Sequence, residues 1–287
     1  MYRSILMALA LSTPLMSLAD SNTPVIDAVE RTAAELDARV GFAAHDLQTG
    51  QRWAYNADHR FALSSTFKTL ACADLLYRVD KGERVLDEEI VISREDLVTY
   101  SPVTEHRVDE SMTLDALCEA TLTTSDNTAA NLILQALGGP GAVTALTRVL
   151  GDDTTRLDRF ETQLNEAQPG DIRDTTTPNA MVHNLTELLL GDTLSRGSRE
   201  QLREWLVGNQ VADDLFRASL PDGWVIADRT GAGGFGSRSI TAVIWPPERE
   251  PLVVAFYITE TGASFEARNE AISRVGAALV EAIQAAQ

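Results

Sequence analysis

Apolar residues recur at the helical period of about 3.6 residues along much of the chain. Residues 24–40, which begin with a proline suited to a first helical turn, show this period, and so do residues 265–285. Between them the same pattern predicts further helices at 65–81, 114–120, 128–137, 142–150, 178–190 and 198–207. Glycines at 82, 138 and 151 mark the ends of three of these helices.

Strand-like runs lie toward the two ends of the chain. Runs at 40–46 and 52–56 flank the turn sequence Gln48-Thr49-Gly50, and further runs lie at 224–228, 239–245 and 252–259. Residues 152–178 are polar and loop-like, with at most a turn or so of helix around 157–164. Strands at both ends with helices between them predict an α+β fold, in which the two ends form one sheet and the middle is a helical insert.

We expect two domains from this arrangement. Residues 20–60 and 208–287 would form the sheet domain, residues 61–207 would form the helical domain, and an active site would lie in the cleft between them. The 287 residues are enough for a large core, and no internal repeat or low-complexity linker interrupts them.

The charged residues exclude some partners and single out one lysine. With a net charge of −18 and no basic cluster, the chain is not expected to bind nucleic acid or an anionic membrane. Only two of the 24 basic residues, Lys68 and Lys81, are lysines. Because lysine can lose its proton and act as a base, whereas arginine cannot, a lysine at 68 in this arginine-rich chain is informative.

The N-terminus has the layout of a secretory signal peptide. Arg3 supplies a positive charge, residues 5–11 form a short apolar core, and Ser17-Leu18-Ala19 places small residues where a signal peptidase cleaves. No later apolar run reaches the roughly 18 residues of a membrane span. We therefore expect residues 1–19 to be removed and the mature chain to be periplasmic or secreted.

Export affects the expected oxidation state of the two cysteines, Cys72 and Cys118. An even number in an oxidising compartment is consistent with a disulfide, and two buried free thiols are the alternative. Neither cysteine belongs to a CxxC or CxxH pattern, and the four histidines occur singly. No metal site is therefore expected.

Ser65 and Lys68 form the first candidate for chemistry. Ser65 stands at the head of an apolar helical run, where free N–H groups suit an oxyanion, and Lys68 follows about one turn later. A hydroxyl beside an amine is one way to activate a serine nucleophile. Taken alone, the pair is more typical of a helix-capping serine with a solvated lysine.

Two further stretches are polar and compact. Ser125-Asp126-Asn127 taken alone is a turn and helix cap. Residues 228–234 begin on a strand, and their glycines would let a ligand lie along the strand edge, although a bulge or turn has the same pattern.

A third stretch lies within the polar segment. Glu161 and Asn165 are spaced so that a carboxylate and an amide could hold one water between them. Arg159 and Asp174 bracket a length suited to a compact loop, and an ion pair between them would close its neck. A solvated loop with incidental charges is the alternative.

Together these motifs resemble class A β-lactamases and penicillin-binding proteins, whose marks are S-x-x-K, S-D-N and K-T-G. They stand here in that order as Ser65-Thr66-Phe67-Lys68, Ser125-Asp126-Asn127 and Arg229-Thr230-Gly231, and Glu161-Thr162-Gln163-Leu164-Asn165 matches the E-x-x-L-N element of class A enzymes. Arg229 replaces the usual lysine, which is similar to the carbenicillin-hydrolysing group. The resemblance covers essentially the whole mature chain and implies an antiparallel five-stranded sheet flanked by terminal helices, with an all-helical insert.

The resemblance also implies roles for the matching residues. Ser65 would form an acyl-enzyme, Ser125 would pass a proton to the lactam nitrogen, and Glu161 would activate the deacylating water. The acylation base stays open between Lys68 and Glu161. The residues implied in substrate binding, including the Ala232 N–H of the oxyanion hole, are Tyr100, Asn127, Asn165, Arg229, Thr230, Gly231, Ala232 and Arg238. The partner would be a small-molecule β-lactam, the enzyme a monomer, and no cofactor is implied.

The resemblance narrows the substrate class. Class A carbapenemases often carry a cysteine bridge at the positions held here by Ser64 and Gly233, so that bridge is absent. We expect a penicillinase that confers antibiotic resistance, with carboxypenicillins among its good substrates, early cephalosporins poorer and carbapenems very poor. A D-Ala-D-Ala peptidase, which lacks the glutamate loop, and a β-lactam sensor that stays acylated, which normally carries membrane spans, are the alternatives.

Overall fold

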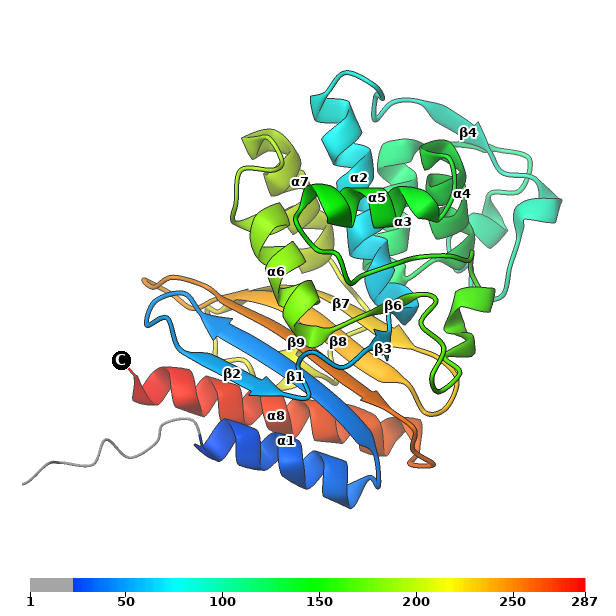
Figure 1. Ribbon diagram of the computed structural model, residues 1–287. Helices are drawn as coiled ribbons and strands as arrows, with labels where there is room; N and C mark the ends of the chain where they lie inside the picture. Colours follow the sequence, from blue (N-terminus) through cyan, green and yellow to red (C-terminus); the bar gives the residue numbers. More distant parts are fainter. Residues whose placement is uncertain (1–22, 287) are drawn as a thin grey trace, which may run out of the picture.

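The computed structural model describes residues 23–286, so the expected signal peptide lies outside the described residues. Its middle layer is a five-stranded antiparallel sheet with the strand order β2-β1-β9-β8-β7 (Figure 1). The strands are β1 (Arg39–Asp46), β2 (Arg52–Tyr55), β7 (Val225–Ala232), β8 (Arg238–Trp245) and β9 (Leu252–Thr259). Because β1 pairs with β9, the two ends of the chain share one sheet, as the sequence predicts.

Helices cover both faces of this sheet (Figure 1). On one face lie α1 (Thr23–Glu35) and α8 (Phe265–Ala285), which pack against each other. On the other face lie α2 (Phe67–Asp80), α3 (Leu114–Thr124), α4 (Asn127–Leu137), α5 (Gly141–Val149), α6 (Pro178–Leu189) and α7 (Arg196–Val207). The predicted α+β class, with terminal helices and a helical insert, is thus confirmed.

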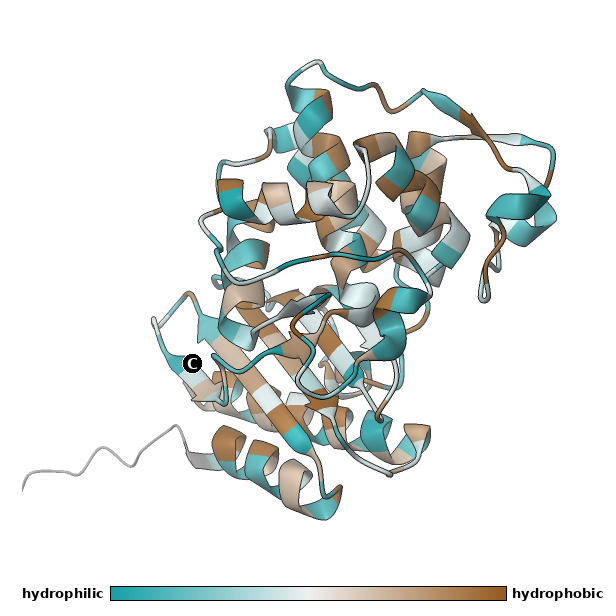
Figure 2. Ribbon diagram, turned by 45° about the vertical axis from the view of Figure 1, so that its right-hand side comes forward, coloured by the Kyte–Doolittle hydropathy of each residue, from teal (hydrophilic) through white to brown (hydrophobic). Residues whose placement is uncertain are grey.

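Two buried apolar clusters hold these layers together. One lies between the sheet and the terminal helices, where the rings of Phe42 and Phe256 pack edge to face at 5.9 Å between centroids. The other joins the opposite face of the sheet to the helical insert and includes Leu70 and Tyr257. All residues of β9 are buried, because this central strand is covered on both faces. In Figure 2 the apolar residues accordingly concentrate on the strands and on the inner sides of the helices.

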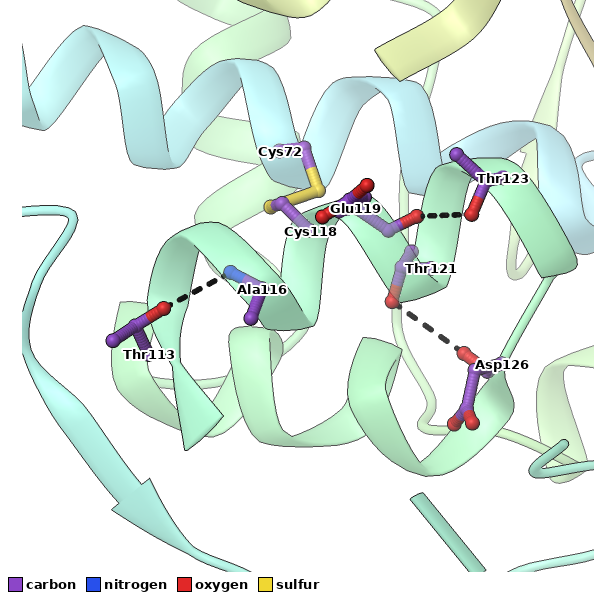
Figure 3. The surroundings of a disulfide bond; sticks show 8 residues. All are labelled: Cys72, Thr113, Ala116, Cys118, Glu119, Thr121, Thr123 and Asp126. Carbon is purple, nitrogen blue, oxygen red and sulfur yellow. Dashed lines mark hydrogen bonds between the residues drawn. A yellow bond between two sulfur atoms is a disulfide. The ribbon is translucent and has the colours of Figure 1, made fainter. Parts of the chain in front are cut away.

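A disulfide links Cys72 of α2 to Cys118 of α3 (Figure 3). Their Cα atoms are 5.8 Å apart, and both residues are completely buried. The alternative of two free thiols is therefore wrong. A bridge of this kind typically contributes about 2–4 kcal/mol to stability, and here it braces the helix that follows the Ser65 turn.

Two predicted boundaries are wrong in an informative way. The first helix ends at Glu35 rather than reaching Val40, because Asp37 adopts the left-handed conformation with φ 44° and turns the chain into β1. The strand predicted at 224–228 begins at Val225 and continues to Ala232, where Ala232 pairs with Arg238 of β8. The Arg229-Thr230-Gly231 motif therefore lies on a regular strand and not in a turn or bulge.

Several short elements carry too few residues for a periodic pattern, and most of them were not predicted. The helical turn expected around 157–164 is a 3-10 helix at Gln163–Glu166. Two small ladders pair β3 (Phe61–Ala62) with β6 (Thr175–Thr176) and β4 (Glu89–Val91) with β5 (Ser111–Thr113). Short 3-10 helices lie at Ser64–Thr66, Arg94–Asp96, Thr104–His106, Gln163–Glu166 and Phe216–Ser219.

Membrane-span criteria are met by no single helix within residues 23–286. The helices α4 and α5, which are bent by 69° relative to each other, meet the length and composition criteria only when taken together.

Candidate active site

Ser65 lies in the 3-10 turn Ser64–Thr66, two residues before α2 begins at Phe67, so it precedes the helix rather than standing in its first turn. Ser64 adopts a left-handed conformation with φ 41°, and the Thr66 hydroxyl donates to the Leu63 carbonyl at 2.6 Å. These contacts fix the turn, which presents Ser65 to a cleft of about 320 Å³.

The cleft collects nine of the twelve residues that the sequence predicts for catalysis and substrate binding. The remaining three, Lys68, Glu161 and Arg229, lie behind its wall and are buried. Val211 and Phe265 also line the cleft, although the sequence interpretation did not include them. The full lining is Ser65, Tyr100, Ser125, Asn127, Asn165, Val211, Thr230, Gly231, Ala232, Arg238 and Phe265.

Lys68 is completely buried, and every proton of its ammonium group faces an oxygen. Its Nζ donates to the Ser125 carbonyl at 2.8 Å, to Ser125 Oγ at 3.2 Å and to Asn127 Oδ1 at 2.6 Å, and lies 3.4 Å from Glu161 Oε1. Burial lowers the pKa of Lys68 to about 8, although the Glu161 carboxylate opposes this shift. The amine is thus prepared to exchange a proton near neutral pH.

Ser125 connects this lysine to the candidate nucleophile. It ends α3 in the left-handed conformation with φ 67°, and its Oγ donates to Ser65 Oγ at 3.3 Å. Within the described residues no direct hydrogen bond joins Lys68 to Ser65, so the link runs through Ser125 rather than along one helix face. This arrangement can relay a proton between the two.

Asp126 and Asn127 hold the mouth of the cleft in place. The buried Asp126 carboxylate caps α4 through the Ala129 N–H and also accepts from the Val103 N–H, both at 2.8–2.9 Å. Asn127 Nδ2 donates to the Thr99 carbonyl at 2.8 Å. The helix cap predicted from the sequence therefore also anchors the loop that carries Tyr100.

Glu161 is buried and is positioned by a residue that the sequence interpretation missed. Asn131 of α4 donates to the Glu161 carbonyl at 2.9 Å and accepts from its N–H at 2.8 Å. The Asn165 amide donates to Glu161 Oε2. Asn165 Oδ1 has no hydrogen-bond partner among the described residues, and Glu161 Oε1 has only the ion pair with Lys68 Nζ at 3.4 Å, although both oxygens are buried. Such paired oxygens can hold a water molecule.

The loop that carries Glu161 is closed at its neck as predicted. Arg159 Nε lies 2.5 Å from Asp174 Oδ2, and the fully buried Asp174 carboxylate also accepts the backbone N–H groups of Asp158 and Arg159 at 2.7 and 2.9 Å. At its other side the loop is bonded to the turn between β7 and β8, since the Gly234 N–H donates to the Asn165 carbonyl at 2.8 Å.

Two arginines, Arg229 of β7 and Arg238 of β8, supply positive charge on the side of the cleft formed by the sheet. Arg229 is buried, and its three guanidinium nitrogens have no hydrogen-bond partner among the described residues. Burial lowers its pKa to about 10, so it stays protonated at neutral pH. Arg238, whose pKa burial likewise lowers to about 10, lines the cleft.

Gly231 allows β7 to approach the Ser65 turn. A Cβ at this position would lie 2.7 Å from Ser239 Oγ, closer than real contacts permit, and 3.0 Å from the Ser64 Cβ, which is tighter than most real contacts. Within residues 23–286, no group of three histidine, cysteine, aspartate or glutamate side chains is arranged to hold a metal ion.

The fold and this geometry are those of a serine hydrolase, with the Ser65 turn between the edge strand β7 and the helical insert. Comparison with protein families matches residues 24–283 to the family described as the beta-lactamase enzyme family. The chain therefore belongs to the β-lactamase family, and it is a class A β-lactamase.

Similar proteins support this assignment across almost the whole chain. The β-lactamase CARB-4 of Pseudomonas aeruginosa is 51% identical over 281 residues, which cover 96% of this chain and 97% of that protein. The β-lactamase AER-1 of Aeromonas hydrophila is 52% identical over 272 residues, covering 94% of this chain and 89% of that protein.

Solved structures agree with the fold. An ancestral class A β-lactamase superposes with a TM-score of 0.88 at 52% identity, covering 90% of this chain and 99% of that one. The chromosome-encoded β-lactamase of Vibrio parahaemolyticus gives a TM-score of 0.89 at 44% identity, covering 91% and 99% respectively.

Proposed function

We propose that the enzyme hydrolyses the lactam amide bond of penicillins through an acyl-enzyme on Ser65 and thereby confers antibiotic resistance. The observation that carries this proposal is the hydrogen-bonded chain from the buried Lys68 through Ser125 to Ser65, beside the buried Glu161 and Asn165. This juxtaposition supports both formation and hydrolysis of an acyl-enzyme.

Acylation begins when Ser65 Oγ attacks the lactam carbonyl carbon. The Ser65 and Ala232 backbone N–H groups stabilise the resulting oxyanion, after which the carbon–nitrogen bond breaks and Ser125 passes a proton to the nitrogen. Either Lys68 or Glu161 acting through a water takes the Ser65 proton. With a pKa of about 8, about one-tenth of Lys68 is neutral at pH 7, enough to serve as a base.

Deacylation uses Glu161 and Asn165. A water held by Glu161 Oε1 and Asn165 Oδ1 loses a proton to Glu161 and attacks the acyl carbon, and Ser65 leaves with a proton returned to its oxygen. Asn131 supports this step, because it fixes the backbone of Glu161 at both its N–H and its carbonyl.

The substrate is bound through its carboxylate and its side-chain amide. Thr230 and Gly231 on the edge strand β7, together with Arg238 on the neighbouring strand β8, suit the carboxylate, and Arg229 adds a positive field behind them. Asn127 and Asn165 on the facing wall suit the amide, and Tyr100 covers the mouth.

Carboxypenicillins are proposed to be among the good substrates. They carry a second carboxylate, and Arg229 presents a permanent charge where most class A enzymes have lysine. Relatives named CARB-4 and PSE-4, at 51% and 49% identity, are consistent with this assignment.

The proposal also covers the location, oligomeric state and partners of the enzyme. We propose a periplasmic or secreted monomer, without nucleic-acid or membrane partners after signal cleavage. The division into residues 20–60 with 208–287 and residues 61–207 stays a prediction. The D-Ala-D-Ala peptidase alternative is disfavoured, because the Glu161 loop supplies a means of deacylation that such a peptidase lacks.

A spectrophotometric panel tests the proposal directly. Wild-type enzyme and the Ser65→Ala variant are assayed with benzylpenicillin, carbenicillin, an early cephalosporin and a carbapenem. We expect wild-type turnover of both penicillins, weaker turnover of the cephalosporin, and none above background for Ser65→Ala. Stoichiometric acylation without turnover would identify a sensor instead.

A further inference from the structure

Phe265 lies beside the cleft in a position that the catalytic roles above do not explain. It is the first residue of α8, after the capping Ser264, and half of its surface is exposed (50%). Its ring lines the same cleft as Ser65, Thr230 and Arg238. Its place in the cleft lining, beside the arginine expected to bind the substrate carboxylate, distinguishes it from other exposed aromatic residues such as Phe235.

The ring of Phe265 is in contact with two guanidinium groups. The guanidinium carbon of Arg238 lies 4.7 Å from the ring centroid, and that of Arg268 lies 5.5 Å from it. Both distances are within the range in which a cation is attracted to the electron-rich face of an aromatic ring. Arg268 also donates to the Ser237 carbonyl at 3.3 Å, which holds it at the start of β8.

The remaining contacts of Arg238 come from the same region. Its Nε donates to Asn269 Oδ1 at 2.8 Å and its Nη1 to the Gly231 carbonyl at 3.1 Å. Asn269 lies four residues after Phe265, so the two side chains project from adjacent turns of one helix face. The first turns of α8 thus hold one edge of the guanidinium by a hydrogen bond and support its face with a ring.

We propose that Phe265 is a positioning residue that fixes Arg238 for recognition of the substrate carboxylate. Arginine has many rotamers, and ordering it only when substrate binds would weaken binding. Supported by Phe265 and hydrogen-bonded to Asn269 and Gly231, Arg238 is already held in place in the structure, which contains no substrate, and the residue is only 5% exposed. This inference rests on the proposed role of Arg238 as a carboxylate ligand.

The test compares benzylpenicillin with its methyl ester, in which the carboxylate is masked. In the wild type, kcat/KM should favour the free acid over the ester. Phe265→Ala should lower kcat/KM for the acid about ten-fold, mainly through a higher KM, and leave the ester within about two-fold. The preference for the acid should therefore shrink by about the same factor as the acid's kcat/KM.

Two conservative variants separate the ring from its apolar bulk. Phe265→Tyr keeps the aromatic face and should retain the wild-type preference. Phe265→Leu keeps much of the apolar surface and should behave like the alanine variant. Full activity in Phe265→Leu would overturn the proposal, because it would show that the aromatic face is not required.

Phe235→Ala is the matched control. Phe235 is 47% exposed, lies in the turn between β7 and β8, and is not part of the cleft lining. It should leave the acid-to-ester ratio unchanged. An equal loss on acid and ester in Phe265→Ala, with a lowered Tm, would also overturn the proposal, since it would indicate a structural role only.

The outcome is distinguishable from failure of the proposed function. A wild-type enzyme that does not hydrolyse benzylpenicillin would contradict the proposed function itself. A wild-type enzyme that hydrolyses it, but shows the same acid preference after Phe265→Ala, would contradict the role of Phe265 alone.

Discussion

Ser64 lies directly against Gly233, so that a Cβ built on Gly233 would be 2.9 Å from Ser64 Oγ. The same Cβ would be 2.9 Å from the Asn165 carbonyl oxygen. The nucleophile turn, the end of β7 and the loop that carries Glu161 therefore meet at one glycine, and a side chain there would affect all three.

The double variant Ser64→Cys/Gly233→Cys should form a disulfide, because its side chains start within bonding reach. The new Cβ must displace Asn165, so deacylation should slow and acyl-enzyme should accumulate. Thiol titration of the unfolded, unreduced protein and burst kinetics measure the two effects. Gly233→Ala, which has the Cβ without the bridge, should share the slow deacylation; normal turnover in that variant would contradict the steric argument.

Glu161→Ala should trap a long-lived acyl-enzyme on Ser65. The variant leaves Lys68 and Ser125 in place but removes the carboxylate that is proposed to activate the deacylating water. Mass spectrometry after mixing with benzylpenicillin should show an adduct of the penicillin mass. The double variant with Ser65→Ala should show none. Normal turnover without an adduct would rule out the role of Glu161.

The same variant tests which group is the acylation base. The Glu161 carboxylate raises the pKa of Lys68 against the effect of burial, so its removal should bring that pKa below about 8. If the neutral amine is the base, the acylation rate in Glu161→Ala should rise with pH through this lower pKa. Stopped-flow acylation measured from pH 5 to 9 gives the profile. Loss of acylation at every pH would assign the base to Glu161 instead.

Arg229→Lys should retain penicillin hydrolysis but weaken the preference for carboxypenicillins. Lysine keeps the positive charge, so benzylpenicillin should be hydrolysed within about ten-fold of the wild-type rate. Because lysine is a compact point charge without the planar fork of arginine, kcat/KM for carbenicillin should fall further. The ratio of the two kcat/KM values is the measurement, and an unchanged ratio would refute this role for Arg229.

The sequence predicts the layers of this fold well because the core is periodic. Residues 265–285 form a helix with the predicted bounds, and the strand at 252–259 is likewise as expected. Isolated tertiary contacts carry no such period. Asn131 could have been noticed as a polar residue in an otherwise apolar helical run, but its partner, the backbone of Glu161, is brought to it only by the fold.

The motifs predicted which residues meet but not how they are connected. The spacing of Ser65 and Lys68 suggested a direct contact along one helix face, whereas the structure joins them through Ser125, from the end of a different helix. Phe265 was missed because it is the first residue of an ordinary amphipathic helix, and only its packing against Arg238 distinguishes it.

The placement of α1 and α8 has a practical consequence. The helix α1 begins and α8 ends at the same side of the molecule, on the sheet face opposite the helical insert (Figures 1 and 2). A short linker could therefore join residue 286 to residue 23 in a circular permutant without crossing the face that carries Ser65. The exposed turn around Asp192, between α6 and α7, then offers a place to open the chain. In such a permutant, a second protein could be attached at this surface turn and thereby coupled to antibiotic hydrolysis.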